Sequence, residues 1–196
     1  MLYSELFAAH LEQLSPGELS TAVEVLIEKA FAISRTQFWI RKNQPVRDAA
    51  GLRRFRGYFA RLQAQEPLAY ILKEKEFFGE PFIVSPAVLI PRPETELLVE
   101  KALVLLGKKP ARVLDIGAGS GAVSLEASLL TPGGAVYAIE QHPGRVQQII
   151  ENRRRWRAAT VEIVAGQAPD CLADLPEPAR VFVGGGGAAL EDILTV

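Results

Sequence analysis

Cysteine, methionine and histidine are scarce in this 196-residue sequence, which holds one cysteine, one methionine and two histidines. The single Cys171 cannot form an internal disulfide or a cysteine-rich metal site, so we expect no bound metal and a reducing, cytoplasmic environment. The net charge of −1 provides no general attraction to nucleic acid or anionic membranes, and we expect neither as a partner. Long apolar runs are also missing, and none reaches the ~20 residues needed to cross a bilayer.

Residues 1–66 show helical periodicity only, and we expect a helical bundle there. The clearest apolar stripe consists of Leu52, Phe55, Phe59 and Leu62. Ser34 and Gln37 have the spacing of a capping box, in which two residues exchange hydrogen bonds at a helix start. The segment from Ser15 to Glu18 is a second helix start of this kind.

Residues 67–110 are expected to form a hairpin and a linker helix. The segment from Phe77 to Val84 is typical of two short strands around a turn. Prolines at 91 and 93 then lead into a helix that we expect to end at a C-cap on Gly107.

Strands and helices alternate over residues 111–196, which predicts an α/β domain with a doubly wound, Rossmann-like parallel sheet. The expected strands are 112–116, 135–139, 161–164 and 180–183. A doubly wound sheet with about three more strands is the fuller form of this fold, so a sheet of these four strands would be truncated. Its fourth strand would be an unpaired edge with Val181, Phe182 and Val183 exposed, which favours self-association through that strand.

A glycine-rich segment, Gly117–Gly121, links the first expected strand to the next helix. Glycines at such a turn permit backbone angles that a Cβ forbids, and they let a ligand approach the main chain. Gly117, Gly119 and Ala122 also fit the dinucleotide pattern. Asp115 lies two residues before the first glycine, and we expect it at the mouth of the turn. An acid at that place suits an ammonium or sulfonium group and repels a pyrophosphate, which favours S-adenosylmethionine over NAD. Glu140 ends the next strand, where a carboxylate can accept the ribose hydroxyls of an adenosine.

This segment resembles the first motif of the class I S-adenosylmethionine-dependent methyltransferases, and Glu140 resembles the acid that ends their second motif. The resemblance implies S-adenosylmethionine as the cofactor and a Rossmann-like fold. It also implies a set of cofactor-binding residues, which are Thr95, Asp115, Gly117, Ala118, Gly119, Ser120, Gly121, Glu140 and Ala168. Gln167 stands where an acid is common, and Ala168 would contribute its backbone.

The first 121 residues resemble the methyltransferases that methylate a glutamine of peptide-chain release factors. The segments that carry this resemblance are Glu66–Leu72, Glu76–Gly79 and Ile90–Glu96. It implies a release factor as the partner. That family has Asn-Pro-Pro-Tyr after its fourth strand, whereas this sequence has glycines from Gly184 to Gly187, so no catalytic residue is assigned.

The second half resembles the decarboxylating precorrin methyltransferases of cobalamin synthesis. Asp115–Ala127, Pro132–Glu140 and Val181–Gly185 carry this second resemblance. It implies a flat corrin precursor as substrate, in a crevice floored by Gly184, Gly185 and Gly186. The two resemblances meet at the glycine segment, which indicates a hybrid of the two families. A non-catalytic cofactor-binding or scaffold module is the alternative from another class.

Overall fold

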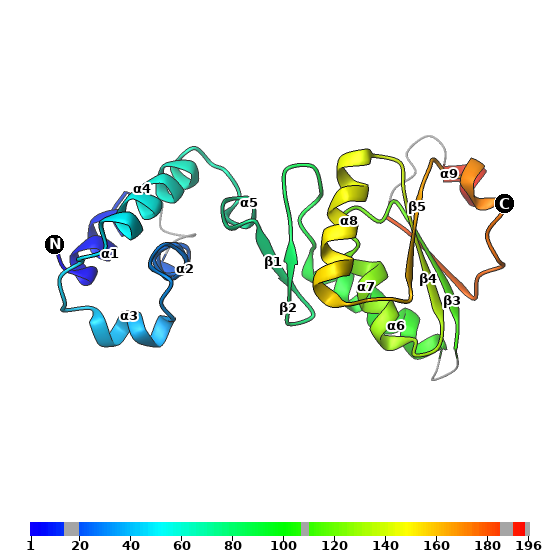
Figure 1. Cartoon of the computed structure of the whole chain (residues 1–196), viewed down its shortest axis with the longest axis horizontal. Helices are drawn as coiled ribbons and strands as arrows, with labels where there is room; N and C mark the ends of the chain where they lie inside the picture. The colour runs from blue at the N-terminus through cyan, green and yellow to red at the C-terminus, as the bar shows by residue number, and fades with distance from the viewer. Residues whose placement is uncertain (14–19, 107–109, 185–189, 195–196) are drawn as a thin grey trace. The chain divides into compact units, whose positions relative to one another are not determined.

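The computed structural model describes residues 1–13, 20–106, 110–184 and 190–194. The chain divides into two compact units, Met1–Leu72 and Lys73–Val196, called here the helical unit and the sheet unit (Figure 1). Among the helices within the described ranges, none is both long enough and apolar enough to cross a membrane.

Amphipathic helices build the helical unit. They are α1 (Tyr3–Leu11), α2 (Ser20–Phe31), α3 (Arg35–Arg41), α4 (Ala49–Gln63) and α5 (Leu68–Leu72). The predicted stripe on α4 faces the core, where Phe55 and Phe59 are buried. The predicted capping box at α3 is confirmed, because Ser34 and Gln37 exchange hydrogen bonds of 2.9 and 3.2 Å. The expected helix start at Ser15 lies outside the described residues.

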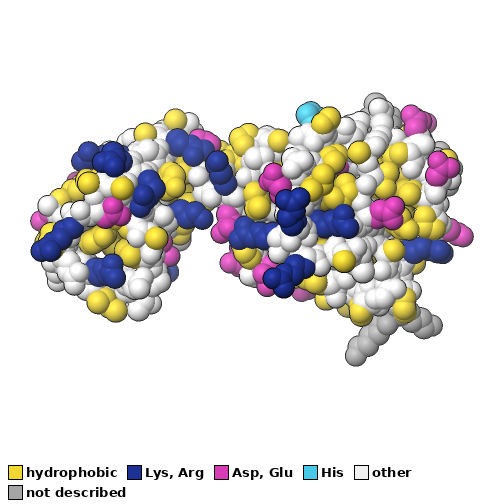
Figure 2. Space-filling model, in the orientation of Figure 1, with side chains coloured by type: hydrophobic (Ala, Val, Ile, Leu, Met, Phe, Trp, Pro, Cys, Tyr) yellow, Lys and Arg dark blue, Asp and Glu magenta, His cyan; other side chains and the backbone are white. Residues whose placement is uncertain are grey.

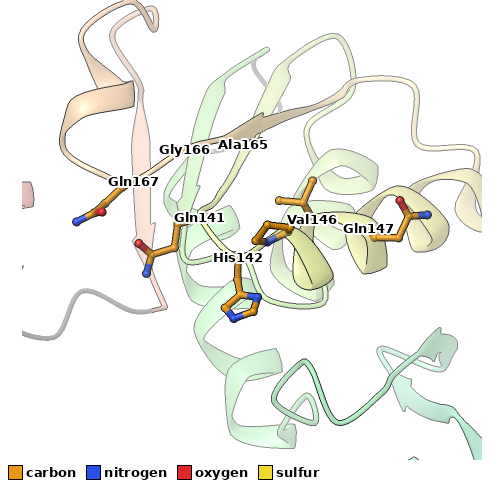
Figure 3. Close-up of a pocket in the computed structure, with 8 residues that line it drawn as sticks. Gln141, His142, Val146, Gln147, Ala165, Gly166 and Gln167 are labelled. Atoms are coloured by element: carbon orange, nitrogen blue, oxygen red, sulfur yellow. The ribbon is translucent and has the colours of Figure 1, made fainter.

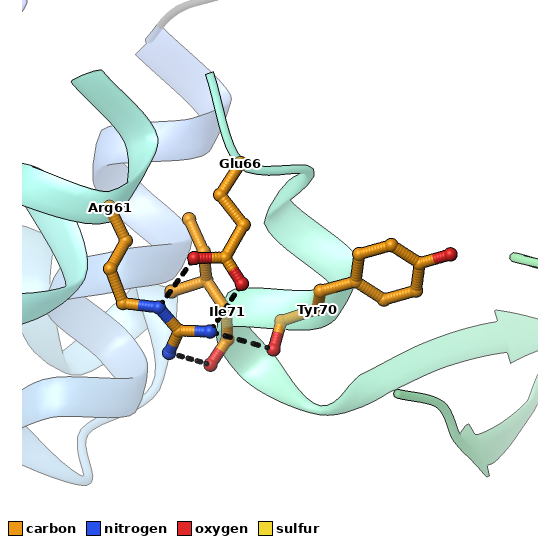
Figure 4. Close-up of polar contacts among 4 residues, drawn as sticks. All are labelled: Arg61, Glu66, Tyr70 and Ile71. Atoms are coloured by element: carbon orange, nitrogen blue, oxygen red, sulfur yellow. Dashed lines mark hydrogen bonds and ion pairs between the residues drawn. The ribbon is translucent and has the colours of Figure 1, made fainter. Parts of the chain in front are cut away.

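Arg61 joins the end of α4 to the segment that follows it (Figure 4). Its guanidinium donates to both carboxylate oxygens of Glu66, at 2.7 and 2.5 Å, and to the carbonyls of Tyr70 and Ile71. The guanidinium hydrogen bond holds the pKa of Glu66 below its usual range. Ile71 is buried in the bundle core. These contacts extend the helical unit to Leu72, six residues beyond the boundary expected from the sequence.

The predicted hairpin is present and opens the sheet unit, but its first strand begins at Glu74, before the segment expected from the sequence. Strand β1 (Glu74–Phe77) pairs with β2 (Glu80–Ile83) in antiparallel register, and Phe78 and Gly79 form the turn with positive φ angles of 52° and 75°. Helix α6 (Pro93–Leu106) holds this turn, because Glu96 accepts a hydrogen bond of 2.8 Å from the Phe78 amide. The expected C-cap at Gly107 lies outside the described residues.

A parallel sheet of four strands confirms the predicted α/β fold. The strands are β3 (Arg112–Ile116), β4 (Ala135–Glu140), β5 (Val161–Ala165) and β6 (Arg180–Val183), in the order β5-β4-β3-β6. The helices α7 (Ala122–Leu130) and α8 (Pro143–Trp156) pack with the hairpin on one face. The short helices η1 (Asp170–Leu172) and α9 (Leu190–Leu194) lie over the other face, where Leu172 and Ile193 join its core. Figure 2 shows acidic and basic side chains interspersed on the visible face of the sheet unit.

Strand β6 is an edge of the described sheet, as expected. Val181 and Val183 are 48% and 36% exposed. The expectation that Phe182 is exposed is wrong, because this ring packs in the core on the hairpin face of the sheet. The apolar exposure at the edge is therefore confined to the face that carries the two valines.

Candidate functional site

The glycine loop, residues 117–121, lies between β3 and α7, where the sequence predicts a turn. The amides of Gly117 and Ala118 donate to the Ile139 carbonyl at 2.9 and 3.0 Å, which holds the loop against the end of β4. Gly121 caps α7 with a φ of 80°, and a Cβ there would lie 3.1 Å from a side-chain carbon of Ile149. Both the backbone angle and the close approach of α8 require glycine at this position.

Glu140 is the last residue of β4 and is only 2% exposed. One carboxylate oxygen accepts the Gly119 amide at 3.1 Å, and the other accepts the His142 amide at 2.9 Å. Arg145 lies 3.9 Å from the same carboxylate. The glycine loop and the predicted acid therefore meet directly, and the acid also holds the first turn of α8.

Asp115 lies on β3 and is 2% exposed, so it is not at the open mouth of the turn as expected from the sequence. Its carboxylate faces α7, where the Ser124 hydroxyl donates to it at 2.5 Å. Burial raises the pKa of Asp115 to about 6, hydrogen bonds from Ser124 oppose this rise, and the nearby Glu140 charge adds to it. Successive side chains of β3 point to opposite faces of the sheet, and other elements cover both faces. The Asp115 carboxyl group is therefore buried.

A pocket of about 560 Å³ opens beyond the carboxyl ends of β4 and β5, beside the start of α8 (Figure 3). Its lining residues are Gln141, His142, Pro143, Val146, Gln147, Ala165, Gly166 and Gln167. The Gly166 amide donates to the Glu140 carbonyl at 3.1 Å, so the pocket adjoins the acid. Open parallel sheets bind ligands at this end of their strands.

The remaining expected site residues are placed as follows. Gly184 follows β6, its amide donates to the Ile116 carbonyl at 2.8 Å, and a Cβ there would lie 3.1 Å from the Gly117 carbonyl oxygen. Thr95 is half-buried in the first turn of α6. Ala168 is buried in the core opposite the hairpin. The expected crevice residues Gly185 and Gly186 lie outside the described part of the chain.

Sequence reasoning missed Asn152, which is fully buried on α8 and contacts the glycine loop. Its spacing could have indicated burial, because Asn152 lies three residues after Ile149 and therefore on the same buried face of the helix. A polar residue at a core position of an amphipathic helix needs a buried hydrogen-bond partner. Within the described ranges, no group of three or more histidine, cysteine, aspartate or glutamate side chains could hold a metal ion.

Two family descriptions match this chain. Residues 5–72 match the PrmC N-terminal domain, and residues 100–195 match the precorrin methyltransferase domain. Among solved structures, the precorrin-6y C5,15-methyltransferase of Geobacter metallireducens GS-15 is 36% identical, with a TM-score of 0.53 and 58% of each chain covered. The sheet unit thus has the fold of the class I S-adenosylmethionine-dependent methyltransferases.

Curated relatives define the relationship more closely. The release factor glutamine methyltransferase of Burkholderia pseudomallei is 40% identical over 149 residues, or 76% of this chain and 52% of that protein. The corresponding protein of Geobacter sulfurreducens is 36% identical over 151 residues, or 77% and 52%. The chain spans about half the length of these relatives. It is related to the release factor glutamine methyltransferases, with a first part similar to the PrmC N-terminal domain and a second part similar to the precorrin methyltransferase domain.

Asp115 leads to a prediction about stability and pH. Because the folded protein holds this proton more tightly than the unfolded chain, folding takes up a proton between about pH 4 and pH 6. The free energy of unfolding should fall by about 3 kcal/mol as the pH rises through this interval, and level off above it. In Asp115→Asn the fall should be smaller by about this amount, and only the part due to other groups with a raised pKa, such as Glu126, should remain. Denaturant unfolding of both proteins from pH 4 to pH 8 measures it, with exposed Asp174→Asn as control. Identical profiles for parent and Asp115→Asn would contradict the assignment.

Proposed function

We propose that the chain binds S-adenosylmethionine beside the glycine loop and transfers its methyl group. The hydrogen bond between the Gly119 amide and the Glu140 carboxylate carries this proposal, because it joins two halves of the expected cofactor site. A carboxylate has about four lone-pair positions. The two backbone amides use two of them, so Glu140 retains capacity for the two ribose hydroxyls.

The surrounding groups fit the rest of the cofactor. Gly117 and Gly119 have positive φ angles and leave the backbone open to close approach by the methionine portion. The adjoining pocket, with its mixed amide and apolar lining, suits an adenine ring. Asp115 supplies negative potential toward a sulfonium or ammonium group. The full proposed set is Thr95, Asp115, Gly117, Ala118, Gly119, Ser120, Gly121, Glu140 and Ala168.

The proposed substrate is a peptide-chain release factor, to which the PrmC N-terminal domain and the curated relatives point. In that reaction a glutamine amide nitrogen forms a bond to the methyl carbon, the carbon–sulfur bond breaks, and the nitrogen loses a proton. The specific observation that favours a corrin precursor instead is the match of residues 100–195 to precorrin methyltransferases. Either substrate would enter near Gly184, which lies against the glycine loop. We further propose a cytoplasmic location, which suits a protein with a single cysteine.

Calorimetric titration with S-adenosylhomocysteine tests cofactor binding. We expect saturable binding by the parent and a weakening of roughly tenfold or more in Glu140→Gln, because an amide cannot accept from both backbone amides and both hydroxyls. The matched control is Glu162→Gln, which removes an exposed carboxylate from β5. No heat of binding at millimolar ligand, with the fold intact, would end the proposal.

Incubation with methyl-labelled S-adenosylmethionine identifies the substrate. We expect label on a glutamine of a peptide-chain release factor, and much less label with Glu140→Gln. Label on a corrin precursor instead would overturn the release-factor assignment in favour of the alternative. Label on neither substrate by a protein that binds S-adenosylhomocysteine would indicate a non-catalytic cofactor-binding module.

We also propose self-association through β6, because its edge is unpaired within the described sheet and exposes two valines. Light scattering at low micromolar concentration should report a dimer or larger oligomer for the parent. Val181→Lys should yield a monomer, since it would place a charged side chain between the two paired edge strands. Val104→Lys, on the exposed surface of α6, should leave the assembly unchanged. A parent that stays monomeric as its concentration rises would contradict this proposal.

A further inference from the structure

The fully buried Asn152 side chain forms hydrogen bonds with two separate segments of the sheet unit. Its carbonyl oxygen accepts from the Ile83 amide at 2.8 Å. Its amide nitrogen donates to the Ile83 carbonyl at 2.9 Å and to the Ser120 carbonyl at 3.0 Å. The side chain thus pairs with the end of β2 as a strand backbone would, and it holds the centre of the glycine loop with its second donor.

An amide is the side chain that fits this position. Ile83 offers one donor and one acceptor, and Ser120 offers one acceptor, which together require one acceptor and two donors in the same side chain. A carboxylate has no donors and would face two carbonyl oxygens. An aliphatic side chain would leave three buried backbone groups without partners, which is costly in an apolar interior.

The position of Ser120 makes this contact relevant to the cofactor. Ser120 lies between Gly119, whose amide contacts Glu140, and Gly121, which caps α7. Holding its carbonyl fixes the peptide plane that Ser120 shares with Gly121, and so limits the backbone angles on both sides of that plane beside a glycine that is otherwise little restricted. A loop that a buried hydrogen bond already holds in its binding shape is preorganised, so it loses less conformational entropy when the ligand binds.

We propose that Asn152 is a positioning residue that holds the glycine loop in its cofactor-binding shape and couples it to the hairpin. This inference rests on the proposed function for its ligand, but the loop geometry can be tested without one. Two neighbours on α8 provide matched controls. Trp156 donates to the Pro81 carbonyl at 3.4 Å, and Arg155 forms an ion pair with Glu74 at 2.9 Å. Both bind the hairpin, and among the hydrogen bonds and ion pairs of the described residues neither reaches the loop.

The experiment compares Asn152→Asp with Trp156→Phe and Arg155→Gln in the full chain. Hydrogen exchange without ligand should be faster at the Gly119 and Gly121 amides in Asn152→Asp, and unchanged there in both controls. The dissociation constant for S-adenosylhomocysteine, measured well below each melting temperature, should rise roughly tenfold in Asn152→Asp. In both controls it should stay within about twofold of the parent.

The outcomes separate the two proposals. If the parent fails to bind S-adenosylhomocysteine, the proposed function fails, while loop exchange still tests the positioning role. If the parent binds and Asn152→Asp binds equally well with unchanged loop exchange, the positioning role is overturned and the proposed function stands. Should Asn152→Asp not fold, the parent alone provides the test. Adding S-adenosylhomocysteine should then slow exchange at the Ile83 amide, and no change there would overturn the coupling.

Discussion

The buried carboxylate of Glu140 is the constraint on which the site depends. A charged group that is 2% exposed must find hydrogen-bond donors inside the protein. Here the donors are backbone amides of Gly119 and His142, so satisfying one side chain fixes both the glycine loop and the first turn of α8. Helix α8 then carries Asn152 to the hairpin, and the same set of contacts extends from the sheet to β2.

The local parts of this arrangement could be predicted from the sequence. Glycine spacing, an acid at the end of the next strand and alternating apolar segments are short-range signals, and they predicted the loop, Glu140 and the parallel sheet. Asp115 and Asn152 were different, because each meets a partner on another element, Ser124 on α7 for Asp115 and the end of β2 for Asn152. The Asn152 partner in β2 is separated from it by 69 positions in the sequence. Nothing near Asn152 in the sequence indicates the strand backbone that it meets.

Edges and boundaries were also harder to predict than elements. Apolar content suggested that Phe182 would be exposed on the outer strand, but the side chains of a strand alternate between faces, and this one points into the covered side. The bundle was expected to end at residue 66, just before Pro67, and proline commonly ends a helix. The short α5 nevertheless packs back on the bundle through Ile71, while Arg61 satisfies the Tyr70 and Ile71 carbonyls.

The central claim is that a cofactor ribose binds at the Glu140 carboxylate while the glycine loop remains attached to it. An NMR titration of the isotopically labelled protein with S-adenosylhomocysteine tests this claim most directly, because the Gly119 and His142 amides both donate to that carboxylate. The account predicts that these two amides show the largest saturable chemical-shift changes in the protein. Saturable changes elsewhere, with both of these amides unmoved, would contradict it.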